Sequence, residues 1–334
     1  MGFRRAVFRS LLTFCGVAAP GCRHLDRAEP SQIPVAPVSV EIASYRPESA
    51  GWGLQFTPVG QAGHELEILG FSFWAHATGE GDIRKVEGTF YKTRRVKPGQ
   101  GAPLLILTPI LAGAVDDYLA CRVFARWASA EGMSAFYLHQ DEDVLTVDRD
   151  ALRLEELLRD SLKDNIRALD LFLSLPEVDP ERLGSIGISM GAIKSVALVA
   201  AEPRLRANVF CLGGADLPRI FATSRERRVV RYVEVRMAWD RITRDDLCFE
   251  IATFLRSEPM AMAPFISNDR ALVFLGTFDD KVPYACGLKL WQQLGCPEAY
   301  ILPLGHYTGI AAAPFAASRM FEYFRKRFGM SEGC

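Results

Sequence analysis

The segment that most constrains this chain is Gly187-Ile188-Ser189-Met190-Gly191. An apolar run, residues 183–188, leads into it, and small residues with helical spacing, residues 192–201, follow it. We therefore expect a strand, a sharp turn and a helix, the context in which a Gly-x-Ser-x-Gly segment has chemical meaning. The glycines let strand and helix approach closely. The turn would expose the Ser189 hydroxyl above the sheet, and the N–H of Met190 would point to where an oxyanion forms.

Apolar runs typical of strands alternate with helical patterns along most of the chain. This alternation predicts a doubly wound, mainly parallel α/β sheet that is covered by helices on both faces. The strands are expected at residues 38–43, 65–74, 86–93, 104–107, 133–138, 183–188, 207–212, 271–275 and 299–302. The clearest helix is expected between residues 154 and 173, where leucine and isoleucine recur every three or four positions.

Residues 216–259 interrupt the alternation, because no strand-like apolar run stands out there. The block is rich in arginine and has apolar residues at helical spacing, so it predicts two or three amphipathic helices. We expect these helices to form a cap over the active site, inserted in an α/β domain that spans residues 38–334. The basic excess of the block is slight, which favours a solvated helical face over an anion site.

Composition narrows the classes of partner and cofactor. The 334 residues include 39 basic and 40 acidic side chains, for a formal net charge of −1, so no nucleic-acid partner is expected. The eight cysteines form no Cys-x-x-Cys pair and the five histidines are scattered, so no metal cofactor is predicted. Cys121 and Cys211 fall in apolar patterns and are expected to be buried free thiols. Whether Cys286 and Cys296 form a disulfide depends on the compartment.

The first 37 residues predict an export signal followed by a flexible tether. Arginines near the start precede an apolar run, residues 11–19, which is too short to span a bilayer. Residues 19–22, Ala-Pro-Gly-Cys, resemble the cleavage box of bacterial lipoproteins, although that box prefers leucine where alanine stands here. The resemblance implies export, lipidation of Cys22 and attachment to a membrane that faces the periplasm. The alternative is an uncleaved N-terminus on a cytoplasmic protein.

A serine nucleophile needs a base within hydrogen-bond reach and a third group that orients the base. In an open parallel sheet such groups follow the carboxyl ends of strands. Asp279 and Asp280 follow one expected strand, and His306 follows the next strand along the chain. The order serine, aspartate, histidine therefore predicts a catalytic triad of Ser189, one of the two aspartates and His306.

From about residue 86 to its last helix, the chain resembles the α/β-hydrolase superfamily of serine hydrolases, and within it the dienelactone-hydrolase and acetyl-esterase relatives. Dienelactone hydrolases use cysteine where this chain has Ser189. In the acid turn of the family, the aspartate stands three residues after a glycine and three before Val-Pro. That spacing, from Gly276 to Val282-Pro283, selects Asp279 and leaves Asp280 facing solvent. Gly305-His306 looks like the base loop of the family, which implies that His306 is the general base and then the general acid.

The resemblance places the second oxyanion donor in the loop after the strand at 104–107. Many relatives have His-Gly there, whereas this chain has Thr-Pro-Ile-Leu-Ala-Gly at residues 108–113. Pro109 has no N–H to donate. Ile110 is therefore expected to join Met190 in the oxyanion hole, and Leu111 is the alternative.

Together these features imply hydrolysis of a small-molecule carboxylic ester through an acyl-serine intermediate, without a metal or organic cofactor. A peptidase, a thioesterase or a C–C bond hydrolase on the same triad is an alternative. So is a catalytically silent protein of this fold that binds a ligand under its cap, although an intact triad argues against it. Acyl chain length, physiological substrate and oligomeric state do not follow from the sequence.

Overall fold

The computed structural model describes residues 21–26, 41–62, 64–77, 82–97, 99–110, 118–140, 145–146 and 150–330. The strands are β1 (Arg23–Leu25), β2 (Trp52–Ala62), β3 (Leu66–His76), β4 (Ile83–Thr93), β5 (Ala102–Thr108), β6 (Ser134–Leu138), β7 (Val178–Ile188), β8 (Leu205–Cys211), β9 (Ala271–Gly276) and β10 (Glu298–Leu302). The helices are α2 (Leu119–Ala130), α3 (Ala151–Phe172), α4 (Met190–Ala201), α5 (Leu217–Thr223), α6 (Arg227–Asp240), α7 (Arg244–Phe254), α8 (Pro259–Met262), α9 (Tyr284–Gln293) and α10 (Ala313–Arg327).

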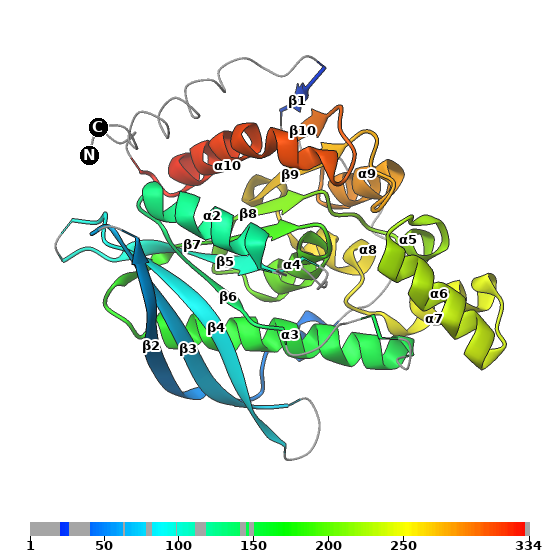
Figure 1. Ribbon diagram of the computed structural model, residues 1–334, viewed down its shortest axis with the longest axis horizontal. Helices are drawn as coiled ribbons and strands as arrows, with labels where there is room; N and C mark the ends of the chain where they lie inside the picture. Colours follow the sequence, from blue (N-terminus) through cyan, green and yellow to red (C-terminus); the bar gives the residue numbers. More distant parts are fainter. Residues whose placement is uncertain are drawn as a thin grey trace.

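The strands join in one sheet in the order β1-β10-β9-β8-β7-β5-β6-β4-β3-β2. The pairs from β10 to β6 are parallel, whereas the pairs that β4, β3, β2 and β1 add at the two edges are antiparallel. Figure 1 shows the sheet in the middle of the molecule, with α2 and α10 on one side and α3 and α4 on the other. The predicted mainly parallel, doubly wound sheet is confirmed.

An apolar core layer lies on each face of the sheet, and β5, which contributes to both layers, has a continuously apolar sequence. Leu104 and Ile106 pack with α3 and α4, whereas Leu105 and Leu107 pack with α2 and α10. All four side chains are almost fully buried. Each such burial contributes about 2 kcal/mol relative to exposure to water. A central strand buried on both faces therefore has no polar alternation.

The N-terminal part departs from the expectations in three places. Residues 42–45 form a short 3₁₀ helix instead of a strand, because buried Tyr45 docks on α3 and donates its hydroxyl to Glu155 at 2.9 Å. Strand β2 is unpredicted, since most of its residues are exposed and give no apolar period. Arg23–Leu25, expected in the flexible tether, pair with β10 as strand β1, where the sheet edge offers free backbone groups.

The predicted export signal at residues 1–20 and most of the tether lie outside the described residues. Within the described residues, no helix combines the length and the apolar character needed to cross a bilayer.

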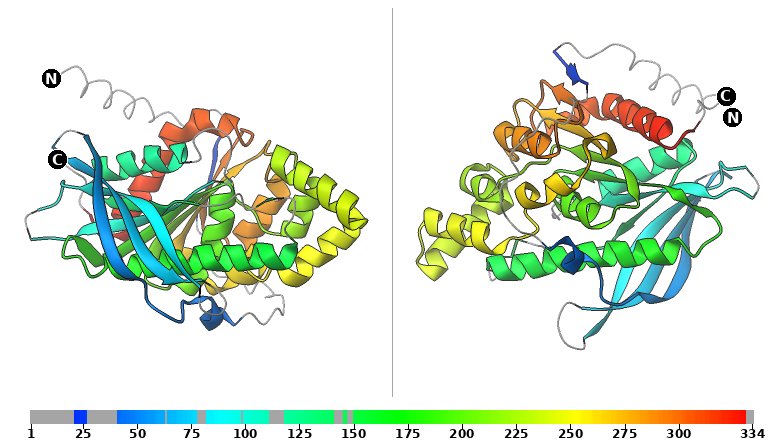
Figure 2. Two further views of the ribbon diagram at one scale, coloured as in Figure 1. Left: turned by 60° about the horizontal axis from the view of Figure 1, so that its bottom comes forward. Right: turned by 180° about the vertical axis from the view of Figure 1, so that it is seen from behind.

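The block at residues 216–259 contains α5, α6 and α7, as its amphipathic pattern predicts. Figures 1 and 2 show that α6 and α7 project from the end of the molecule opposite to the antiparallel strands β2–β4. The inner faces of these helices and the first turns of α3 share one buried apolar cluster, which includes Leu154 and Leu158 of α3, Tyr232 of α6 and Leu247 of α7. The carboxylate of Glu250 also accepts the backbone N–H of Ala151 at 2.8 Å, at the N-terminus of α3. The three helices are thus docked on the body by both apolar and polar contacts.

Candidate active site

Ser189 lies at the junction of β7 and α4, in a backbone conformation that few side chains adopt. Its φ is +57°, and its N–H donates to the carbonyl of Cys211 at 2.8 Å. A Cβ at Gly187 would lie 2.2 Å from the Ser195 hydroxyl oxygen, and one at Gly191 only 2.1 Å from the Thr108 carbonyl oxygen. Both glycines are therefore required, and they hold the serine in a strained turn between strand and helix.

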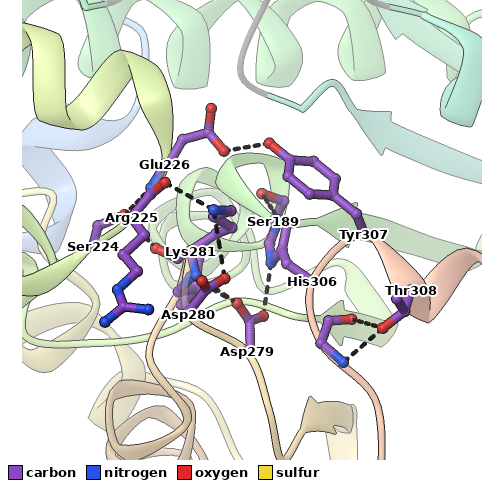
Figure 3. A network of polar contacts seen from close by, with 12 residues as sticks. Ser189, Ser224, Arg225, Glu226, Asp279, Asp280, Lys281, His306, Tyr307 and Thr308 are labelled. Carbon is purple, nitrogen blue, oxygen red and sulfur yellow. Dashed lines mark hydrogen bonds and ion pairs between the residues drawn. The ribbon is translucent and has the colours of Figure 1, made fainter.

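The structure brings the three predicted side chains into one hydrogen-bonded chain (Figure 3). Nδ1 of His306 lies 2.7 Å from Oδ2 of Asp279, and Nε2 lies 2.8 Å from Oγ of Ser189. An ionised carboxylate can only accept, so Nδ1 carries the hydrogen and Nε2 is left to accept from the serine hydroxyl. This is the arrangement in which a histidine can take the proton of an attacking serine.

The loop after β9 separates the roles of its two aspartates. Oδ1 of Asp279 accepts the backbone N–H groups of Lys281 and Val282, both at 2.9 Å, while Oδ2 faces the imidazole. The residue is 7% exposed. Asp280 is exposed, and its carboxylate lies 3.5 Å from the Lys281 ammonium. Of the two aspartates, Asp279 alone contacts the histidine, as the spacing of the acid turn suggests.

Backbone hydrogen bonds fix the acid loop against the base loop. Thr277 and Phe278 donate their N–H groups to the carbonyls of Leu302 and Leu304, at 2.9 and 3.1 Å. Behind the histidine, the N–H of Gly305 donates to the Thr308 hydroxyl at 2.8 Å. The relative position of Asp279 and His306 is therefore set by the ends of β9 and β10.

The two predicted oxyanion donors lie near the same helix start. Met190 is the first residue of α4, where the leading N–H groups have no acceptor within the helix. Ile110 follows β5, whose last residue, Thr108, donates its hydroxyl to the carbonyl of Gly191 at 2.9 Å. The end of β5 therefore lies against the first turn of α4. Leu111, the alternative donor, lies outside the described residues.

Two polar contacts near the triad involve residues that no sequence motif singles out. Lys194 on α4 donates to Oε1 of Gln140 at 2.7 Å, and burial lowers the pKa of this lysine to about 8. Tyr307 donates its hydroxyl to Glu226, just before α6, and its ring meets the His306 ring edge-on with 5.6 Å between centroids (Figure 3). Burial, reinforced by Glu226, raises the pKa of Tyr307 to about 12. In the sequence, the one feature that pointed to any of these contacts is Lys194, a lone lysine in the otherwise small and apolar segment that forms α4.

The cysteines of the described residues are all free thiols, including Cys286 and Cys296. Cys121 and Cys211 are buried, as expected. Burial, assisted by the charge of Asp279, raises the pKa of Cys211 to about 12. The Cys22 thiol is half-buried, immediately before β1. Within the part of the chain that the structure describes, no three His, Cys, Asp or Glu side chains gather as metal ligands would.

Neither a protein-family model nor a curated protein sequence matches this chain. Solved structures do. Acetyl xylan esterase 1 from a Thermoanaerobacterium species is 18% identical, over 81% of this chain and 87% of that chain, with a TM-score of 0.58. An acetyl xylan esterase from a Paenibacillus species is 18% identical, over 86% of this chain and 99% of that chain, with a TM-score of 0.60. The chain has the α/β-hydrolase fold.

A third similar structure, the acylaminoacyl peptidase of Pyrococcus horikoshii, is 17% identical over 79% of this chain, with a TM-score of 0.52. The match covers only 42% of that longer chain. At these identities the likeness describes the fold, whereas activity has to be argued from the site.

Proposed function

We propose that this protein is a serine hydrolase that cleaves carboxylic esters through an acyl-serine intermediate. The observation that carries the proposal is the unbroken chain of hydrogen bonds from Asp279 through His306 to Ser189, with heavy-atom distances of 2.7 and 2.8 Å. A serine hydroxyl is a weak nucleophile unless a base stands within this reach and is itself oriented by a third group. Both conditions are met here, at the carboxyl ends of β7, β9 and β10.

In the first half of the reaction, Oγ of Ser189 attacks the ester carbonyl while Nε2 of His306 takes the hydroxyl proton. Collapse of the tetrahedral intermediate breaks the bond to the alcohol oxygen, and the imidazolium returns its proton to that leaving group. In the second half, water attacks the acyl-serine, again losing its proton to Nε2, and the acid leaves as Ser189 recovers its proton. Asp279 stays ionised and stabilises the imidazolium throughout.

The negative charge of each tetrahedral intermediate falls on the former carbonyl oxygen. We place this oxygen between the N–H groups of Met190 and Ile110. The start of α4 supports the first assignment, because its leading N–H groups point along the helix axis and favour an anion. The contact between Thr108 and Gly191 supports the second, because it brings the end of β5 to the same helix start.

The solved structures that match most of this chain and most of their own length favour esters over peptides as substrates. The two acetyl xylan esterases are matched over most of both chains, whereas the peptidase is matched over less than half of its own length. A peptidase on the same triad is the second candidate, and the peptidase match is the observation in its favour.

We further propose that residues 216–259 act as a cap that limits substrate size. The link between α5 and α6 supports this role, because it is bonded to the loop of Asp279. The N–H of Arg225 donates to the carbonyl of Asp280 at 2.8 Å, and the Ser224 hydroxyl donates to the carbonyl of Lys281 at 2.6 Å. Glu226, the next residue, accepts from Tyr307 beside the histidine.

Labelling with a fluorophosphonate, combined with a series of acyl esters of graded chain length, tests the activity. We expect the adduct on Ser189 alone, and we expect Ser189→Ala to abolish both labelling and ester hydrolysis. Amide and thioester substrates in the same assay separate the alternatives. An adduct on another serine, or a folded protein that neither labels nor hydrolyses any ester, would sink the proposal.

Export and lipidation at Cys22 form a separate proposal, supported by the basic start, the short apolar run and Gly21-Cys22. Cleavage before Cys22 would leave β1, which begins at Arg23, as the first element of the mature chain. Expression in a bacterium with labelled palmitate tests this, and we expect the label in the membrane fraction. A soluble, unlabelled product that retains Met1 would count decisively against it.

A further inference from the structure

Lys194 occupies an unusual place for a lysine, in the helix that follows the candidate nucleophile. Its neighbours in α4 are almost all small or apolar and buried. The residue is half-buried, and burial of its ammonium lowers the pKa of Lys194 to about 8. Burying an ammonium costs free energy that packing alone does not return. The side chain donates to Oε1 of Gln140 at 2.7 Å, at the end of β6.

Gln140 connects this lysine to the loop after β5. Its Nε2 donates to the carbonyl of Ile110 at 3.2 Å, and its backbone N–H donates to the hydroxyl of Tyr118 at 2.6 Å. An ammonium can only donate and a carbonyl can only accept, so one orientation of the amide satisfies both partners. The chain of bonds from Lys194 through Gln140 to Ile110 therefore has a fixed direction.

The end of β5 and Ile110 after it are thus held to α4 at two levels. At the first turn of the helix, the Thr108 hydroxyl donates to the carbonyl of Gly191 at 2.9 Å. About one turn further along, Lys194 holds Ile110 through the glutamine amide. Between the two anchors, Pro109 has a restricted φ. The backbone of Ile110 is therefore fixed relative to the start of α4, where Met190 lies.

We propose that Gln140 and Lys194 are positioning residues that hold Ile110 at the correct distance from Met190 for the two N–H groups to share one oxyanion. The inference rests on the proposed function, because the oxyanion forms only when Ser189 attacks. Neither side chain is assigned to the reacting atoms, and both act through the carbonyl of Ile110. Donors that are preorganised in this way contribute to the transition state more than to substrate binding.

Three variants, assayed with one activated ester as substrate, test the chain of hydrogen bonds from Lys194 through Gln140 to Ile110. Gln140→Glu keeps an acceptor for Lys194 but removes the donor to Ile110. Gln140→Met removes the amide without adding a charge. Lys194→Met leaves the amide free to turn. Gln55→Glu on the exposed strand β2 is the matched control for the added charge. Circular dichroism and thermal melting check that every variant folds.

We expect both Gln140 variants to lower kcat by about ten- to a hundredfold with KM changed less than about threefold, since one oxyanion donor is worth about 10²–10³ when it is removed outright. The rate of fluorophosphonate labelling should fall in parallel. Lys194→Met should cost less, and its combination with Gln140→Glu should cost less than the product of the two single effects, because both act through one contact.

A folded Gln140→Met with wild-type kcat would overturn the proposal, because the donor to Ile110 would then be dispensable. So would a rise in KM at constant kcat, which would indicate a loss of binding rather than of positioning. If the wild-type protein itself neither hydrolysed esters nor labelled, the proposed function would fail and this inference with it, an outcome that the wild-type assay reveals by itself.

Discussion

The turn that carries Ser189 is closed by backbone packing, whereas the loops that carry Asp279 and His306 are held by polar contacts between distant segments. At the turn, Cβ atoms on Gly187 or Gly191 would overlap neighbouring oxygen atoms. In the acid and base loops, by contrast, carboxylate and hydroxyl contacts join the acid loop, the base loop and the link before α6. The packed turn should therefore be destabilised by any added atom but should not respond to pH. The polar contacts should tolerate some substitutions, but their strength depends on the charge of each group and on its partner.

The largest effect is expected from the acid of the triad. Asp279→Asn keeps the shape of the side chain but favours the wrong tautomer of His306, and in a Ser-His-Asp enzyme this costs about 10⁴ in kcat. The adjacent Asp280→Asn is the matched control, since Asp280 is exposed and contacts Lys281 rather than the histidine. It should change kcat less than about tenfold. Kinetics on one ester, with folding checked by circular dichroism, compare the two, and the reverse ranking would place the acid one residue later.

The second prediction tests the packed side of the comparison. Gly191→Ala would place a Cβ 2.1 Å from the Thr108 carbonyl oxygen, which is backbone and cannot turn away. We expect it to destabilise the fold by about 3 kcal/mol or more, as a severe case of overpacking. Gly99→Ala tests a glycine with open space around it, although its φ of +79° carries its own strain of about 1 kcal/mol. Urea unfolding measures both. Equal losses would mean that close packing does not define the turn.

The contrast also explains what the sequence could and could not predict. The Ser189 turn is local, because its strand, glycines and helix lie within about twenty residues, and every part was visible. The aspartate and the histidine could be placed at strand ends, but choosing Asp279 over Asp280 took the spacing of a known acid turn. The contacts of Gln140 with Lys194 could not be predicted, since they join segments about fifty residues apart that only the folded sheet brings together.

The same reasoning covers the fold. Strands that are buried on both faces, such as β5, have continuous apolar runs in the sequence, so the parallel centre of the sheet was predictable. Strand β2 is exposed at the sheet edge and is held to β3 by backbone hydrogen bonds. Backbone bonds do not require any particular pattern of side chains, so this strand could not be predicted from the sequence. Strand β1 is three residues long and depends on the edge of β10, far away in the sequence.

The third prediction concerns Glu258, whose carboxylate is bonded to both ends of the cap at residues 216–259. Its carboxylate accepts the N–H groups of Asp216 and Leu217, at 2.6 and 3.1 Å, and that of Met260 at 2.7 Å. Burial nevertheless raises the pKa of Glu258 to about 7. The folded state then holds the proton more tightly than the unfolded state, so this stabilisation is complete below about pH 4.5 and is lost as the pH rises to 7.

Between pH 5 and pH 8, the free energy of unfolding should fall more for the wild type than for Glu258→Gln, because the amide cannot ionise. The difference between the two falls should be about 3 kcal/mol at most. Unfolding in urea at the two pH values measures the difference. Glu177→Gln on the surface is the control, because the Lys92 ammonium beside it lowers the pKa of Glu177 and gives no loss in this direction. Parallel curves for wild type and Glu258→Gln would show that this carboxylate does not make the cap pH-sensitive.

The smallest effect is expected at the contact between Tyr307 and Glu226, which joins the base loop to the cap. Tyr307 is 64% exposed, yet the bond to Glu226 and the Lys281 ammonium, 5.8 Å from the ring centroid, hold its ring beside His306 (Figure 3). Tyr307→Phe keeps the ring and removes only the bond. If the cap limits substrate size, freeing this ring should change the ratio of kcat/KM between long and short acyl esters by up to about tenfold, or about 1.4 kcal/mol. Glu226→Gln, which keeps an acceptor, should change the ratio less. An unchanged ratio in both Tyr307→Phe and Glu226→Ala would mean that the link before α6 does not border the substrate.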